Sequence, residues 1–280
     1  MAKLSKILFF SMLCFVFTAG VSGADYYTLK DGNSTAKFDT DFGMKSWEVD
    51  GTNHLFQQSF YYRVGGGAEA NIGTLTLGPS GTFDTNFDTL KDTLFARYLG
   101  AGFDVEVRYS LDGGAPGSRR ADIAEQVSIT NTGSTALDFH FFQFSDFDLN
   151  GTSGDDSAAM NNQNTVRQWD SGLMMSETVV IPTPDRYQID NFPNLWGSLI
   201  DGSPTDLNNS PGIGSALGPG DVAWAFQWDF NLSPGDSFQI SKDKQISPVP
   251  EPATMFLLGS GLIGLIGFGR RRSGRLGNNN

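Results

Sequence analysis

The stretch Phe103–Leu111 constrains the fold more than any other part of the chain. Apolar side chains stand at its odd positions and polar ones at its even positions, without interruption. Because successive side chains of a strand point to opposite faces, this pattern predicts a half-buried strand. Turn-forming residues 112–117 follow, and Ile123–Thr130 then alternates again. We therefore expect these two segments to form a β-hairpin.

Further short strands are predicted at intervals of roughly ten residues. Leu137–Phe144 carries apolar side chains on both faces, which is typical of a central strand covered on both sides; His140 is expected there as a core or cross-strand residue. Val222–Phe230 gathers its tryptophans and phenylalanines on one face. The remaining predicted strands are Ser46–Val49, Ser59–Val64, Ile72–Leu77 and Ser237–Ile240.

No stretch between residues 25 and 246 shows a sustained helical period. The chain has 34 glycines and 23 phenylalanines, a combination of turn formers and bulky β formers. The predicted fold class is therefore all-β, with a single β-sandwich that extra strands enlarge in a jelly-roll-like manner. Residues 150–164 and 201–220 are predicted to be long surface loops, and Lys242–Pro248 to be a polar linker.

The first 24 residues have the composition of a secretory signal peptide. Lys3 and Lys6 precede the apolar run Ile7–Phe17, which is too short to span a membrane, and small residues at 22–24 favour cleavage by signal peptidase after Ala24. Cys14 is the only cysteine and lies in the removed segment. The exported chain is thus expected to have no disulfide, thiol nucleophile or thiolate metal site.

The exported body is strongly acidic. Residues 25–246 contain 13 Lys and Arg against 30 Asp and Glu, a net charge of −17. Such a charge repels nucleic acid and favours solubility and cation binding, so nucleic-acid binding is excluded.

An apolar run ends the chain. Residues 253–269 are uncharged and mostly apolar, and as a helix they would span ~25 Å, slightly less than the hydrocarbon core. Arg270, Arg271 and Arg272 follow at once. Basic residues stay on the cytoplasmic side, so we expect a transmembrane helix with a basic cytoplasmic tail at 270–280.

The residues just before this helix are Val249, Pro250, Glu251 and Pro252. A Pro-Glu-Pro outside an apolar helix, with arginines inside, resembles the PEP-CTERM sorting signal of exported bacterial proteins. The resemblance covers Val249–Arg272 and implies that an exosortase recognises Pro250, Glu251 and Pro252, with Arg270–Arg272 as the stop. A plain anchor that is never cut is the alternative.

The expected organisation has three parts. They are the signal peptide 1–24, the all-β body 25–246 and the sorting segment 247–280, which comprises a linker and motif at 247–252, the helix 253–269 and the tail.

One segment of the body has the spacing of a calcium loop. Asp146, Asp148 and Asn150 stand at the first, third and fifth positions, and Gly151 stands at the sixth. Oxygen ligands at this spacing can surround a hard cation. The twelfth position is Ser157 in place of the usual glutamate, so an ordinary solvated acidic turn is the alternative. No other cofactor is expected.

Aromatic side chains offer candidate sugar contacts. Trp169 and Trp196 lie beside predicted loops and are proposed to stack on glycans, whereas Trp224 and Trp228 share the apolar face of a strand and should belong to the core. Paired carboxylates could in principle hydrolyse sugars, but thirty acids make close pairs unavoidable. No residue is assigned a catalytic role.

We therefore expect a non-enzymatic protein exported across the inner membrane. It would be held there transiently with its C-terminus in the cytoplasm, and then reach the cell surface or extracellular matrix. The resemblance implies a biofilm or exopolysaccharide role, with exosortase, signal peptidase and exopolysaccharide as partners. The alternative is a secreted glycan-binding or glycan-active protein that depends on calcium.

Overall fold

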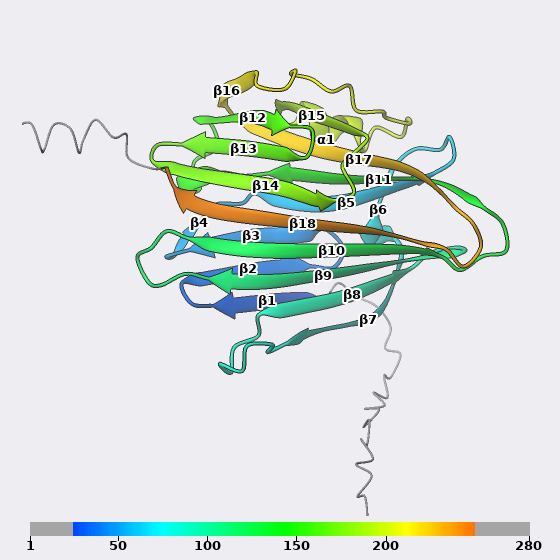
Figure 1. The fold of residues 1–280 in the computed structure, drawn as a ribbon, viewed down its shortest axis with the longest axis horizontal. Helices are drawn as coiled ribbons and strands as arrows, with labels where there is room; N and C mark the ends of the chain where they lie inside the picture. Colours follow the sequence, from blue (N-terminus) through cyan, green and yellow to red (C-terminus); the bar gives the residue numbers. More distant parts are fainter. Residues whose placement is uncertain (1–24, 250–280) are drawn as a thin grey trace, which may run out of the picture.

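The computed structural model of the chain describes residues 25–249, which form two antiparallel sheets packed face to face (Figure 1). Sheet A has the order β1 (Tyr26–Asp31), β2 (Ser34–Asp39), β3 (Gly43–Val49), β5 (Gln57–Val64), β11 (Leu137–Asp146), β17 (Val222–Leu232) and β15 (Arg186–Asn191), with β4 (Thr52–Asn53) beside β3 and β6 (Ala70–Asn71) beside β5. Sheet B has the order β16 (Ala216–Gly220), β12 (Asp156–Asn162), β13 (Thr165–Asp170), β14 (Leu173–Ile181), β18 (Ser237–Pro248), β10 (Ala121–Asn131), β9 (Phe103–Gly113), β8 (Thr93–Leu99) and β7 (Thr76–Phe83). The predicted all-β sandwich is confirmed.

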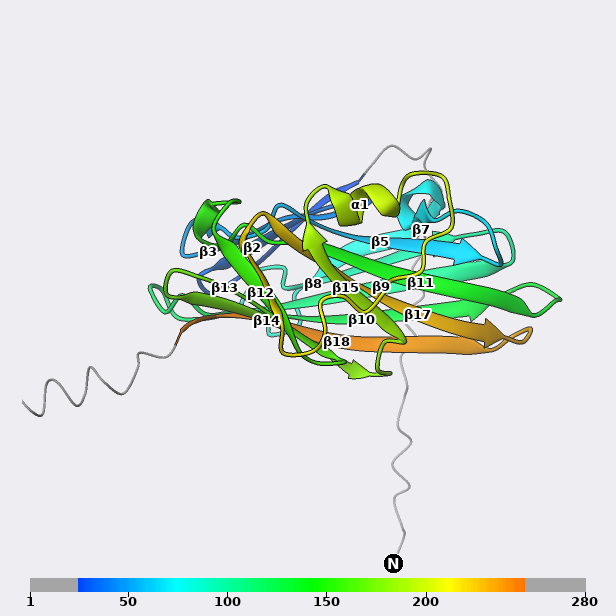
Figure 2. The same ribbon diagram turned by 90° about the horizontal axis from the view of Figure 1, so that it is seen from above.

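Helical segments are few and short. They are the 3₁₀ turns η1 (Ile72–Thr74) and η2 (Leu149–Gly151) and the helix α1 (Asn194–Ser198), which covers the outer side of sheet A (Figure 2). Among residues 25–249, no helix has the length and apolar character needed to cross a bilayer. The predicted signal peptide and transmembrane helix lie outside the described residues.

The hairpin predicted from the alternating pattern is confirmed. Strands β9 and β10 pair antiparallel in one continuous register, with Val107 opposite Val127. Side chains at odd positions of β9 are buried in the core, while those of Glu106 and Arg108 reach solvent. The period-two pattern therefore fixed which face of the hairpin meets sheet A.

Strand β11 is covered on both sides, as its sequence predicted. Phe139 and Phe141 point into the core between the sheets. Phe142 and Phe144 point the other way, into a second apolar cluster with Leu195 of α1. Short helix α1 thus buries the face of β11 that would otherwise meet water.

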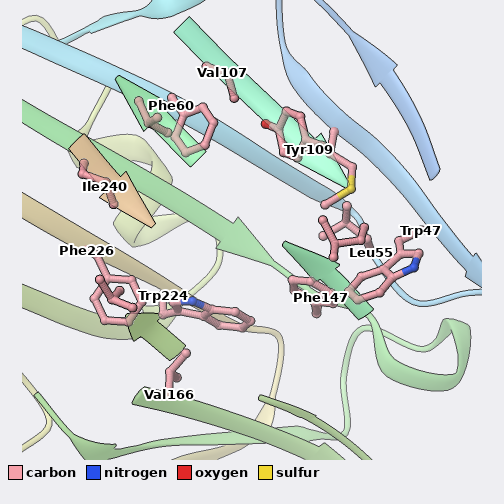
Figure 3. Close-up of a cluster of buried hydrophobic side chains, with 14 of the residues drawn as sticks. Trp47, Leu55, Phe60, Val107, Tyr109, Phe147, Val166, Trp224, Phe226 and Ile240 are labelled. Carbon is pink, nitrogen blue, oxygen red and sulfur yellow. The ribbon is translucent and has the colours of Figure 1, made fainter. Parts of the chain in front are cut away.

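The core between the sheets is built largely from aromatic rings (Figure 3). Phe147 stacks on Trp224 at a centroid distance of 5.4 Å and meets the edge of Trp47 at 6.1 Å. Fully burying such a side chain stabilises the fold by roughly 1.5–3 kcal/mol. Trp224 and Trp228 are fully buried, which confirms their assignment to the core.

Two local predictions were wrong. Residues 150–164 are not one long loop, because β12 pairs there with β13 and buries Ala158 and Met160. The buried positions of β12 carry mainly small side chains among polar ones. The segment therefore has the composition of a loop, and its strand could not be recognised from the sequence. The first residues of the predicted strand Ile72–Leu77 form the 3₁₀ turn η1, which is capped by a hydrogen bond from Gly73 N to the Asn71 side chain. Strand β7 begins only at Thr76.

The prediction of a polar linker at Lys242–Pro248 was also wrong. This segment belongs to β18, which pairs with β10 on one side and β14 on the other. Lys242 and Lys244 are turned inward and are 1% and 0% exposed. They pair with the buried Glu125 and Glu177, and this ionic cluster lets lysines occupy core positions.

Candidate functional site

Three carboxylates meet at one end of sheet A. Oxygen atoms of Asp146, Asp148 and Asp221 all lie within 4.8 Å of one another. Asp146 ends β11, Asp148 precedes η2, and Asp221 precedes β17. Because Asp146 is paired with Ala223 across β11 and β17, the start of β17 brings Asp221 beside it. We call these three residues the acidic cluster.

The acidic cluster contains two of the three residues predicted for calcium. The third, Asn150, is engaged by other side chains: Arg119 Nη2 donates to its Oδ1 at 2.6 Å, and its Nδ2 donates to Asp170 Oδ2 at 2.8 Å. Asp221 was missed by sequence analysis because it is distant in the chain. The sequence offered one signal that could have identified Asp221: it is an acidic residue immediately before the predicted strand Val222–Phe230.

The acidic cluster has little to balance its charge. Asp146 is 1% exposed, and its Oδ1 has no hydrogen-bond partner. Burial raises the pKa of Asp146 to about 8, with further contributions from Asp221, Asp148 and Asp156. Burial also raises the pKa values of Asp148 and Asp221. Within residues 25–249 no ion pair joins any of the three to a basic side chain.

A second candidate site is a groove of about 300 Å³ on the outer face of sheet B. Polar side chains from three neighbouring strands form its floor: Glu106, Arg108, Gln126, Ser128, Gln239 and Ser241. Phe95 and the exposed Ile181 add apolar walls, and the Arg108 guanidinium lies 5.9 Å from the centre of the Phe95 ring. Planar polar groups next to an aromatic ring can hydrogen-bond and stack on a sugar.

The outer face continues beyond the groove. One row of cross-strand neighbours consists of Arg167, Ser176, Gln245, Asp122 and Asp112. Asp122 has its pKa raised to about 7, first by burial and then by a hydrogen bond with Asp243 and the charges of Asp243 and Asp112. A carboxyl group that keeps its proton near neutral pH is suited to general acid chemistry.

The two tryptophans predicted to contact glycans lie in different surroundings. Trp169 is 37% exposed and lies opposite Met174 on the outer face of sheet B. Trp196 lies on α1, stacks on Phe192 at 5.9 Å, and donates its indole N–H to the Tyr61 hydroxyl at 3.0 Å. Only Trp169 shares a face with the groove.

The histidines do not form a joint site. His140 Nδ1 lies 2.6 Å from Asp229 Oδ1, its direct cross-strand neighbour, as expected for a cross-strand residue. His54 is buried, and its Nδ1 accepts a hydrogen bond from Asn150 N at 3.0 Å. This bond holds the turn that follows Asp148.

Residues 248–273 match the family described as the PEP-CTERM protein-sorting motif, so the predicted resemblance is confirmed. Such a motif implies export, a membrane-held C-terminus and processing by an exosortase. Val249 is described by the structure, and its N–H donates to Gly172 O at 3.1 Å. Pro250, Glu251, Pro252 and Arg270–Arg272 lie outside the described residues. No curated protein matches the chain.

The sandwich is similar to several solved structures. A bacterial glucoamylase complexed with acarbose aligns with a TM-score of 0.56 and 8% identity over 87% of this chain, which spans only 36% of the glucoamylase. A galactose 1-epimerase from Lactobacillus acidophilus NCFM gives 0.54 and 8% identity over 80% of this chain and 95% of its own. A putative aldose 1-epimerase from Escherichia coli K12 gives 0.50 and 12% identity over 81% of this chain and 100% of its own. At such identities the similarity concerns the fold.

Proposed function

We propose that the chain is an exported protein of the cell surface or extracellular matrix whose sandwich binds polysaccharide on the outer face of sheet B. Signal peptidase removes residues 1–24, the C-terminal helix holds the protein in the inner membrane, and an exosortase cuts near Pro250-Glu251-Pro252. The resemblance to PEP-CTERM proteins implies delivery to a surface where exopolysaccharide is produced, which supports this proposal.

The groove on sheet B is the observation that carries the binding proposal. It opens on a strand face, so an extended chain of sugars can lie across several strands at once. Its amide, guanidinium and hydroxyl groups offer donors and acceptors side by side, and Phe95 offers a ring. Trp169 extends the same face for a longer ligand. The names of the similar structures, glucoamylase and aldose epimerase, agree with a sugar as the ligand.

Binding without catalysis is the function that the groove supports best. Its one carboxylate, Glu106, lies 3.6 Å from Arg97, which also binds Asp104 at 2.5 Å. Glycoside hydrolysis ordinarily uses a pair of carboxylates, and the groove is lined by one. The groove is thus suited to hold a sugar rather than to cleave it.

A direct test is a glycan-binding screen on residues 25–249, which contain both sheets. Gln126→Ala and Arg108→Ala should each weaken binding about tenfold, the effect of losing one or two hydrogen bonds to a ligand. Lys30→Ala changes an exposed residue of β1 that does not line the groove; it is the control and should bind normally. Equal affinity in all four proteins would rule out the groove.

A second candidate function is catalysis on glycans, favoured by Asp122. If this acid acts as a proton donor, hydrolysis or epimerisation in the same screen should follow a pKa near 7 and disappear in Asp122→Asn, while binding remains. Absence of any turnover would leave binding alone as the function.

A further inference from the structure

We propose that the acidic cluster of Asp146, Asp148 and Asp221 binds one calcium ion, which fastens the crossover of the chain between the two sheets. The ligand set differs from the linear loop that the sequence suggested, because Asp221 replaces Asn150. This inference is independent of the polysaccharide groove, which lies on the other sheet.

The first support is the unsatisfied carboxylate of Asp146. Its side chain is 99% buried, and Oδ1 accepts no hydrogen bond. A buried polar oxygen without a partner is costly, and natural structures almost always satisfy such a group with a donor, a water molecule or an ion. A cation between the three carboxylates would satisfy it.

The second support is the absence of a basic partner. The basic side chains bonded to neighbours of the cluster are engaged elsewhere: Arg119 binds Asn150, and Lys45 binds Gln57 at 3.1 Å. Gln57 is the cross-strand partner of Asp146, so Lys45 is bonded to the adjacent strand but does not pair with the carboxylate. Mutual repulsion of the three acids is therefore balanced by no ion pair among residues 25–249.

Ligand chemistry selects the ion. All three ligands are hard carboxylate oxygens, and the only cysteine of the chain lies outside residues 25–249. Calcium accepts irregular sets of oxygen ligands at about 2.3–2.6 Å, so ligands on opposite sides of it are separated by about 5 Å at most. Oxygens that all lie within 4.8 Å of one another fit that range. Magnesium needs a smaller and more regular octahedron.

The position of the cluster gives the ion a structural role. After Asp146 the chain leaves sheet A, passes through η2 and enters sheet B at β12. Leu149 N already donates to Asp156 Oδ2 across this crossover at 3.2 Å. An ion bound by Asp146, Asp148 and Asp221 would join the end of β11, the crossover and the start of β17.

The experiment is thermal unfolding of the detergent-solubilised full-length chain, followed by tryptophan fluorescence, in calcium, in magnesium and in chelator. Trp224 stacks on Phe147, the first residue of the crossover after Asp146, and reports on this region. We expect calcium at about a hundred times its Kd to raise Tm by about 5 °C. Equilibrium dialysis should find one ion per chain.

Variants separate this ligand set from the alternatives. Asp148→Asn and Asp221→Asn should abolish the calcium shift, and in chelator each should melt above the unaltered chain, because repulsion is relieved. That reversal is not expected of a residue with a merely structural role. Asn150→Ala and the exposed Asp155→Asn are controls and should keep the shift.

Three results would overturn the proposal. The first is no calcium shift in the unaltered chain. The second is a shift that survives in Asp148→Asn or Asp221→Asn, and the third is a shift that is lost in Asn150→Ala. An equal shift with magnesium would overturn the assignment to calcium.

Discussion

His54 illustrates how a single buried side chain ties stability to pH. Burial, followed by the nearby charge of Arg119, lowers its pKa to about 4. The unfolded chain binds a proton near pH 6.5, so the folded state loses stability as pH falls from about 6.5 toward 4. We expect His54 to account for a loss of about 1–2 kcal/mol between pH 7 and 5.

Urea unfolding of the unaltered chain and of His54→Gln at these two pH values measures this contribution. Glutamine can still accept the hydrogen bond from Asn150 N but does not titrate, so the variant should lose less stability on acidification. If both proteins lose the same free energy, His54 is not the group responsible. The His140→Gln variant, at a partly exposed cross-strand position, is the matched control.

At the same scale, two of the three residues of the acidic cluster could be predicted from the sequence. Asp146 and Asp148 were found because their spacing is local. The Asn150 side chain bonds Arg119 and Asp170 and the residue has a positive φ of 58°, and a spacing rule carries no information on either feature. Asp221 joins through the pairing of β11 with β17, a contact that no short motif records.

Strand β18 is the element in which pattern and structure differ most. Its inward positions alternate Ile240, Lys242, Lys244 and Ile246, so a polar composition concealed a central strand. Lysine suits these positions only because Glu125 lies opposite on β10 and Glu177 on β14. The partners come from different strands, so the strand cannot be recognised from its own residues.

Removing one charge of this ionic cluster should be costly. Lys244→Met leaves Glu125 and Glu177 to share the single charge of Lys242, and we expect the free energy of unfolding to fall by about 3–5 kcal/mol. Adding Glu125→Gln restores neutrality and should recover at least half of that loss, because the hydrogen bond from Gln58 Nε2 can be kept. Urea unfolding of the single and double variants provides the measurement. A single variant within experimental error of the unaltered chain would show that the contacts of Lys244 with Glu125 and Glu177 do not stabilise the fold.

At the scale of the whole molecule, the sequence predicted the fold class but not the strand order of the sheets or the groove. Period-two alternation and the lack of helical periodicity predicted an all-β sandwich, since these follow from how side chains point along a strand. The number of strands, the order of the sheets and the groove depend on long-range pairing, and no local pattern specifies them.

The motif match covers residues 248–273 and overlaps the described sandwich only at Pro248 and Val249, so we expect the body and the sorting motif to be separable. We therefore expect Glu251→Ala to leave the fold unchanged and to keep the uncut chain in the inner membrane, with cell fractionation and immunoblotting as the measurement.

A reporter protein carrying residues 1–24 and 249–280 should be released like the natural chain. The matched control is Glu48→Ala, which removes a partly exposed acidic side chain on β3. This variant should be released normally. Normal release of the Glu251→Ala chain would show that the Pro-Glu-Pro sequence is not the element that the processing enzyme recognises.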